Sequence, residues 1–218
     1  MKRTLLITLA ALCSCFVAEA QLRTITPSNI FKVPNISHAT YESEATLDRD
    51  KYDNEDNPLY WDLHIGSLSC TGESVVASSY LSSQGSSSYR ASNIKDGNHE
   101  TAWVEGGNGY GIGEWIEFQD ISADGTITGI NILNGYVKSN KAWSENTRVK
   151  SLKVYYNDRP LCILELQNSR SLQYFGIDDL LEGYTSHISK LRFEILEVYP
   201  GTKYQDTVIS ELYFNSAN

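Results

Sequence analysis

Apolar and polar residues alternate along several short segments of this chain, and the alternation is the strongest constraint on its fold. Residues 190–198 and 126–132 place an apolar side chain at nearly every second position, as a strand with one buried face does. Turn signals, such as Asn134-Gly135 and the run 157–160, separate the apolar segments. Only residues 177–181 suggest a helix, and it would be short. The pattern predicts an all-β sandwich or jelly roll, with further strands at 75–81, 152–156, 161–166 and 207–214.

A glycine-containing loop at residues 93–103 carries the oxygen ligands that a small hard cation prefers. Asp96 supplies a carboxylate, Asn98 an amide oxygen and Thr101 a hydroxyl, while Gly97 permits a tight turn. These residues predict a structural Ca²⁺ site. The alternative is an Asx-type turn, in which the same side chains bond to the backbone and no metal binds.

The run Asp96-Gly97-Asn98-x-x-Thr101-x-Trp103 resembles the signature loop of discoidin-like (coagulation factor 5/8 type C) domains. Further motifs follow in order at 101–106, 111–116, 134–138, 146–150, 172–175 and 203–211, and together they resemble the bacterial NADase-type glycan-binding domain. The resemblance covers roughly residues 70–215. It implies a discoidin-like jelly-roll β-sandwich, a carbohydrate-binding role, and a carboxylate from the last strand, Glu211, that completes the Ca²⁺ shell.

One segment between predicted strands, residues 136–148, has the composition of a sugar-binding loop. Such sites combine an aromatic platform with polar groups that reach the sugar hydroxyls. The candidate ligands are Trp143 as the platform, Tyr136, Lys138, Asn146 and Arg148 in the same segment, and Glu105 and Tyr110 in the glycine-rich loop facing it. The alternative is that Tyr136 and Arg148 brace the loop and Trp143 is a packing residue. Trp103 and Trp115 are expected in the core.

The first 20 residues have the features of an export signal. A basic start precedes an apolar run too short to cross a membrane comfortably, and Ala18-Glu19-Ala20 is a small-x-small cleavage site. The exported chain would then begin at Gln21. The alternative is a lipoprotein signal in which Cys15 is lipidated at the cell surface.

Three regions are therefore expected: a signal peptide at 1–20, an acidic polar linker at 21–65, and the sandwich domain at 66–218. No second membrane-spanning stretch follows the signal. Export leaves Cys70 and Cys162, which either form a disulfide or remain free thiols.

Net charge and motif content limit the classes of function that this chain can have. The net charge of −9 disfavours nucleic acid and anionic membranes, since both require concentrated Lys and Arg. The glycine-rich segment 107–113 lacks the spacing of a nucleotide loop, and the four His are scattered. Together with the resemblance, which implies carbohydrate binding, these features predict an exported, non-catalytic module that binds a glycan or polysaccharide. The alternatives are a structural or protein-interaction module of the same fold at the cell surface, and a glycoside-active enzyme.

Overall fold

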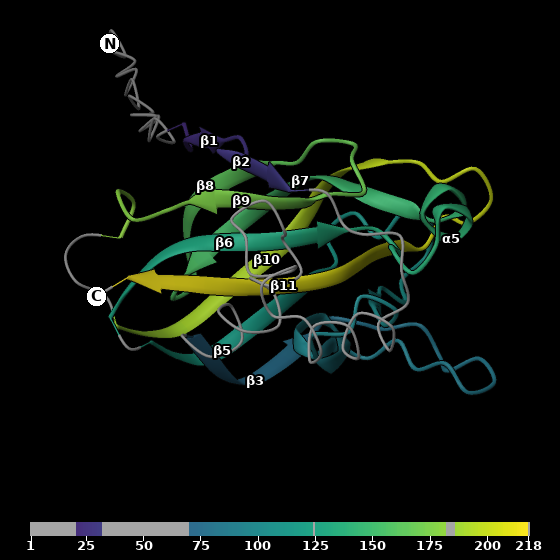
Figure 1. Cartoon of the computed structure of the whole chain (residues 1–218), viewed down its shortest axis with the longest axis horizontal. Helices are drawn as coiled ribbons and strands as arrows, with labels where there is room; N and C mark the ends of the chain where they lie inside the picture. Colours follow the sequence, from purple (N-terminus) through teal and green to yellow (C-terminus); the bar gives the residue numbers. More distant parts are fainter. Residues whose placement is uncertain (1–20, 32–69, 124, 182–185, 218) are drawn as a thin grey trace, which may run out of the picture.

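The computed structural model describes residues 21–31, 70–123, 125–181 and 186–217 of the 218-residue chain (Figure 1). The predicted signal peptide and residues 32–65 of the predicted linker lie outside the described residues. The described ranges contain eleven strands, one short α-helix and one 3-10 turn. The predicted all-β fold class is confirmed.

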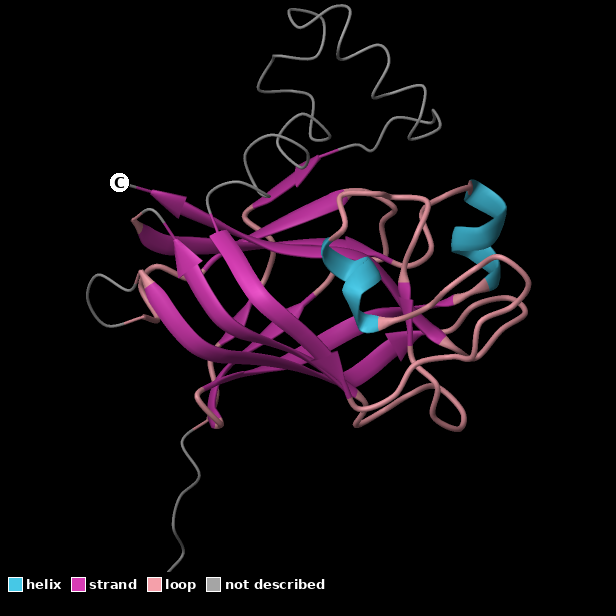
Figure 2. Cartoon of the chain, turned by 90° about the horizontal axis from the view of Figure 1, so that it is seen from below, coloured by secondary structure: helices cyan, strands magenta, loops and turns pink. Residues whose placement is uncertain are grey.

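The strands form two layers that pack face to face. One layer has the order β2 (Asn29–Phe31), β9 (Leu172–Gly176), β6 (Thr126–Asn134) and β11 (Thr207–Ala217). The other has the order β8 (Arg159–Glu165), β7 (Thr147–Tyr156), β10 (His187–Tyr199), β5 (Trp115–Ala123) and β3 (Cys70–Ala77). In Figure 2 the helical turns and most of the loops gather at one end of this sandwich.

Strand β11 connects the two layers at that end. Its residues from Glu211 to Ala217 pair antiparallel with β6, whereas Thr207 and Val208 pair parallel with the start of β7. The same end of β11 also pairs with the short strand β4 (Trp103–Val104). The chain therefore keeps strand pairing on both sides of this crossing as it passes from one layer to the other.

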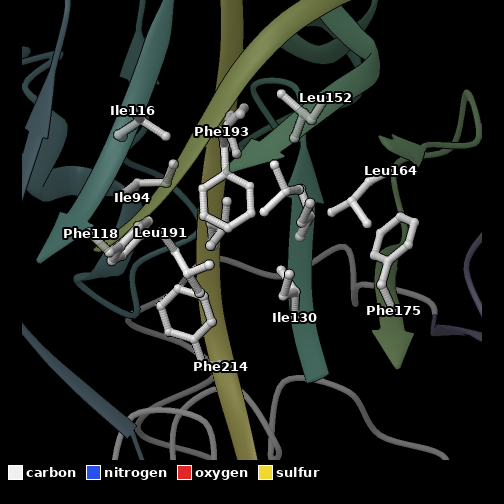
Figure 3. Close-up of a cluster of buried hydrophobic side chains, with 14 of the residues drawn as sticks. Ile94, Ile116, Phe118, Ile130, Leu152, Leu164, Phe175, Leu191, Phe193 and Phe214 are labelled. Atoms are coloured by element: carbon white, nitrogen blue, oxygen red, sulfur yellow. The ribbon is translucent and has the colours of Figure 1, made fainter. Parts of the chain in front are cut away.

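The core lies between the layers and is mainly aromatic and branched aliphatic (Figure 3). The ring of Phe118 on β5 packs edge-on against Phe214 on β11, with centroids 5.0 Å apart, although these strands are not neighbours in the hydrogen-bonded order. Phe193 on β10 lies 6.1 Å from Phe118 in the same geometry. This contact between non-neighbouring strands is direct evidence that the two layers face each other.

The N-terminal described segment adds a strand to each layer. Strand β1 (Thr24–Ile25) pairs parallel with β8, and β2 pairs antiparallel with β9. The sequence-based boundary began the sandwich at residue 66, so the predicted linker contains these two strands. They were not anticipated because segments of two and three residues are too short to show alternation.

Three local features refine the sequence-based expectations. Asn157 and Asp158 both have positive φ, at 47° and 65°, as the central residues of a tight β7–β8 hairpin require. The suggested helix at 177–181 is a hydrogen-bonded turn in which the N–H of Leu180 donates to the carbonyl of Ile177. Cys162 is a buried free thiol, and burial raises its pKa to about 12.

No helix in the described ranges is long and apolar enough to cross a membrane.

Replacement of Phe118 by Ala should lower the free energy of unfolding by about 3–5 kcal/mol, because it removes a ring that contacts aromatic side chains of both layers. Chemical denaturation measures the change. The matched control is Ser122→Ala at an exposed position on the same strand, which should alter stability by no more than about 0.5 kcal/mol. Equal effects of the two substitutions would contradict the assigned core.

Candidate functional site: a pocket at the loop end

A cavity of about 350 Å³ opens at the loop end of the sandwich, beside helix α5 (Asn140–Glu145). Four separate segments line it: the loop at 81–89, strand β4, residues 136–146 and the loop at 204–206. Proteins bind drug-sized ligands in cavities of roughly 300–1,000 Å³, so this volume suits a small ligand. The helix lies at the right of Figure 1, opposite the C-terminus.

Tyrosine side chains and the aliphatic residues Leu81, Val104 and Ala142 supply the apolar surface of this pocket. Tyr136 is 8% exposed and packs in a small cluster with Val104 and Tyr89, so its ring is held rigidly. Tyr204 is 40% exposed, and its backbone N–H donates to the carbonyl of Glu145 at 2.8 Å. That bond fixes the 204–206 loop against the end of α5.

Charged groups in the pocket are balanced. Lys141 and Glu145 of α5 form an ion pair with Nζ and Oε1 2.7 Å apart, and this contact with Lys141 lowers the pKa of Glu145. Lys138 Nζ lies 4.4 Å from the centroid of the Tyr136 ring, while Asp206 contributes a second carboxylate. The pocket therefore has two cationic and two anionic side chains, and it favours no net ligand charge.

Helix α5 forms because its ends are capped. The Ser139 side chain accepts a hydrogen bond from the N–H of Ala142 at 3.1 Å, as an N-cap residue does. At the other end, both the backbone N–H and the side-chain Nδ2 of Asn146 donate to the Ala142 carbonyl, at 3.2 and 2.8 Å. Asn146, predicted as a ligand, lines the pocket from this position.

Trp143 and Arg148 lie behind the pocket and do not line it. Trp143 packs on the cluster of Leu133, Val137, Leu172 and Tyr213, and its indole N–H donates to the Asn134 carbonyl at 3.0 Å. The Arg148 guanidinium stacks 4.3 Å from the Trp143 ring and donates to the carbonyls of Trp143 and Asn146, both at 2.9 Å. Both side chains thus hold the loop that carries the pocket-lining residues.

Glycine is required beneath this stack. Gly135 has a φ of 84°, and a Cβ at this position would lie 2.7 Å from Arg148 Cγ and 2.8 Å from Trp143 Cδ1. The predicted turn at Asn134-Gly135 thus leaves room for the Trp143–Arg148 stack.

Glu105 and Tyr110, the predicted ligands from the glycine-rich loop, are not among the residues that line the pocket. The Glu105 carboxylate is fully buried and accepts hydrogen bonds from the N–H groups of Gly107 and Thr207, at 2.7 and 3.1 Å. Burial raises the pKa of Glu105, against the effect of these two bonds. Tyr110 is exposed, and its carbonyl accepts a bond from Thr207 Oγ1 at 2.8 Å.

The predicted cation loop brings its oxygen atoms together. Thr101 Oγ1 lies 2.7 Å from Asp96 Oδ2 and 2.8 Å from the Asn98 carbonyl oxygen, and Gly97 turns the chain with a φ of 70°. Pairing of Ile209 with Trp103 places Glu211, which is 1% exposed, near the level of Thr101. This donor set fits a hard cation.

The same side chains also form the alternative Asx turns. The N–H of Asn98 donates to Asp96 Oδ1 at 2.9 Å, and the N–H of Glu100 donates to Asn98 Oδ1 at 3.0 Å. Across the described ranges, no group of three His, Cys, Asp or Glu side chains is arranged to hold a metal. Calcium binding at Asp96, Asn98, Thr101 and Glu211 stays a prediction.

The two predicted core tryptophans differ in environment. Trp103 is fully buried and donates its indole N–H to the Ser79 carbonyl at 3.0 Å. Trp115 is half-buried, with the Arg192 guanidinium 4.6 Å above its ring.

Several pocket residues were not among the predicted ligands, notably Tyr89, Tyr204, Asp206, Lys141 and Glu145. Tyr89 ends a serine-rich loop, and the motif at 203–211 contains Tyr204 and Asp206. Both stretches were visible in the sequence. Nothing along the chain indicates that they meet the 136–146 segment, because contacts between distant loops arise only from the strand order.

The two-layer all-β sandwich agrees with the family match, which assigns the chain to the discoidin-like, coagulation factor 5/8 type C class. The family described as the NAD glycohydrolase translocation F5/8 type C domain matches residues 69–215, and the chain belongs to this family.

Solved structures with similar folds include two modules from Clostridium perfringens. CpGH89CBM32-5, in complex with GalNAc-β-1,3-galactose, is 15% identical, with a TM-score of 0.49 over 70% of this chain and 99% of that chain. CBM32-3 from a family 31 glycoside hydrolase is 17% identical, with a TM-score of 0.47 over 70% and 94% of the two chains. Similarity at this level does not identify a ligand for this chain. A comparison with curated protein sequences gives no match.

Substitution of Glu105 by Gln should change how stability depends on pH. A carboxyl with a raised pKa in the folded state contributes stability that is present below its ordinary pKa and is lost as pH rises through the raised value. The glutamine cannot titrate, so the variant should gain stability relative to the wild type as pH rises from about 4 to about 8. Denaturant unfolding of both proteins across this range measures the difference, and a difference independent of pH would contradict the assignment.

Proposed function

We propose that this chain is an exported, non-catalytic module that binds a glycan in the loop-end pocket. The observation that carries the proposal is the convergence of Tyr136 and Tyr204 with Lys138, Asn146 and Asp206 in one cavity of about 350 Å³. Membership of an F5/8 type C family supports a binding role, and the basic and apolar character of the first 20 residues supports export.

The chemistry of the pocket suits a sugar. A pyranose presents an apolar face of C–H groups, which packs on aromatic rings such as the partly exposed Tyr204. Its hydroxyls donate to carboxylates and accept from ammonium and amide groups, the functions that Asp206, Lys138 and Asn146 offer. Since the pocket charges balance and the chain carries −9, neutral glycans are favoured over polyanions.

A glycan array with the chain from Gln21 onward should give a coherent set of neutral sugars, and Tyr204→Ala should weaken binding about tenfold or more. Loss of an aromatic anchor from a binding site typically costs at least 1–2 kcal/mol, and about 1.4 kcal/mol corresponds to a factor of ten. Isothermal titration with the best sugar measures the change.

Tyr80→Ala is the matched control, because Tyr80 is 54% exposed and lies outside the pocket lining. This variant should bind as the wild type does. A folded protein that binds no sugar would contradict the proposal and leave the alternative, a protein-interaction module that uses the same loops.

We also propose that the loop of Asp96, Asn98 and Thr101 binds a structural Ca²⁺ with Glu211 as a further ligand. Addition of Ca²⁺ at about 100 times its Kd should stabilise the protein by about 2.7 kcal/mol. Thermal unfolding in Ca²⁺ and in EDTA measures this, and Asp96→Asn should remove the effect. The neighbouring exposed Glu100→Gln should retain it. Identical unfolding in Ca²⁺ and EDTA would mean that the loop is an Asx turn without metal.

A further inference from the structure

A second cavity, of about 200 Å³, lies away from the loop end. It is on the face of the β2–β9–β6–β11 layer that points away from the main core, since its lining residues alternate with core residues. Asn131 lies between the buried Ile130 and Ile132 of β6, and Tyr213 lies between Leu212 and Phe214 of β11. Because successive strand residues point to opposite faces, the cavity and the core are on opposite sides of this layer.

The strand register explains how the cavity is built. Asn29 on β2 pairs with Tyr174 on β9, Tyr174 pairs with Asn131 on β6, and Asn131 pairs with Tyr213 on β11. One row across four strands therefore alternates amide and phenol side chains. No sequence motif marks this row, since its members come from positions far apart in the chain.

The rows of paired residues on either side of this Asn–Tyr row shape the cavity. On one side the paired residues Phe31 and Leu172 provide an apolar wall. On the other side Gly129 and Gly176 pair with each other and provide no side chains. A Cβ on Gly129 would overlap the ring of Tyr174. Glycine at this position therefore allows the Tyr174 ring to pack against the backbone of the sheet. The cavity thus has an aromatic and apolar wall with amides in its floor.

The lining selects an uncharged, polar ligand. None of the residues that line the cavity is Asp, Glu, Lys, Arg or His, so a charged ligand would find no counter-charge there. The Asn131 side chain is 4% exposed and donates to the Asn215 side chain, and its Oδ1 accepts no hydrogen bond within the described ranges. An apolar ligand would bury the Asn131 Oδ1 without a hydrogen-bond donor, which is unfavourable.

The volume limits the size of that ligand. A cavity of about 150 Å³ accepts a six-membered ring as large as benzene, so about 200 Å³ accommodates one sugar ring and no more. We propose that this cavity is a second sugar-binding site, which takes a single uncharged sugar ring between the aromatic side chains and the amides of Asn29, Asn131 and Asn215.

The two cavities are separated along β11. Asp206 lines the loop-end pocket and Tyr213 lines the second cavity, and seven residues of extended chain span roughly 23 Å. One pyranose cannot reach both, whereas two parts of one polysaccharide can. Occupation of both would raise the apparent affinity for a polymer without any new contact.

The test is a titration of ¹⁵N-labelled chain, from Gln21 onward, with methyl glycosides of glucose, galactose, mannose and N-acetylglucosamine, followed by amide NMR. At least one glycoside should cause saturable shifts at the backbone of Tyr174 and at the side-chain amides of Asn131 and Asn215. These shifts should persist in Tyr204→Ala, which removes a residue of the loop-end pocket only. Failure of the proposed function and failure of the second site are therefore separable.

Asn29→Trp should fill the mouth of the cavity and raise the Kd for these shifts at least tenfold, because Asn29 is exposed at its rim. Ile30→Trp is the matched control. It is the next residue of β2, faces the opposite side and is 41% exposed, so it should leave the Kd unchanged. Shifts confined to the loop-end pocket, an absence of shifts with all four glycosides, or an unchanged Kd in folded Asn29→Trp would each overturn the proposal.

Discussion

The pairing of β11 with three other strands is the constraint on which the rest of the molecule depends. Its last seven residues complete one layer beside β6, while Thr207 and Val208 join β7 of the other layer and Val208 and Ile209 hold β4. The loops at this end are then tied to β11 by side chains. Ser210 Oγ donates to the Gly135 carbonyl at 2.8 Å, and the Thr207 N–H donates to Glu105 at 3.1 Å. A shift of this strand would therefore move both walls of the loop-end pocket together.

The strands were predictable from sequence because the alternation of apolar and polar residues is visible within a few residues. Alternation at 190–198 identified β10, and the asparagine-containing turn before Pro160 identified the β7–β8 hairpin. Helix α5 was not predicted, since six residues with a serine cap do not complete an amphipathic pattern. The edge strands β1 and β2 were also missed, because two and three residues are too few to show alternation.

The residues that line the candidate pocket were less predictable than the fold. Of the residues predicted in segment 136–148, Tyr136, Lys138 and Asn146 line the loop-end pocket. Trp143 and Arg148 have the composition of a sugar platform, but their surroundings are set by Asn134 and Asn168, which lie in other segments. Whether an aromatic ring is covered or open is decided by such distant neighbours. Tyr204 and Asp206 enter the pocket for the converse reason, because the 204–206 loop bonds to the end of α5.

The N-terminal strands have a consequence for how copies of this chain coexist. Strands β1 and β2 pair along β8 and β9, which would otherwise present open backbone groups at adjacent sides of the two layers. Open strand edges recruit strands from other molecules and promote aggregation. The segment from Thr24 to Phe31, which sequence patterns assigned to a linker, thus covers part of these two strand edges. Two residues cover part of β8 and three cover part of β9, so these pairs leave shorter open edges for a strand of another molecule to join.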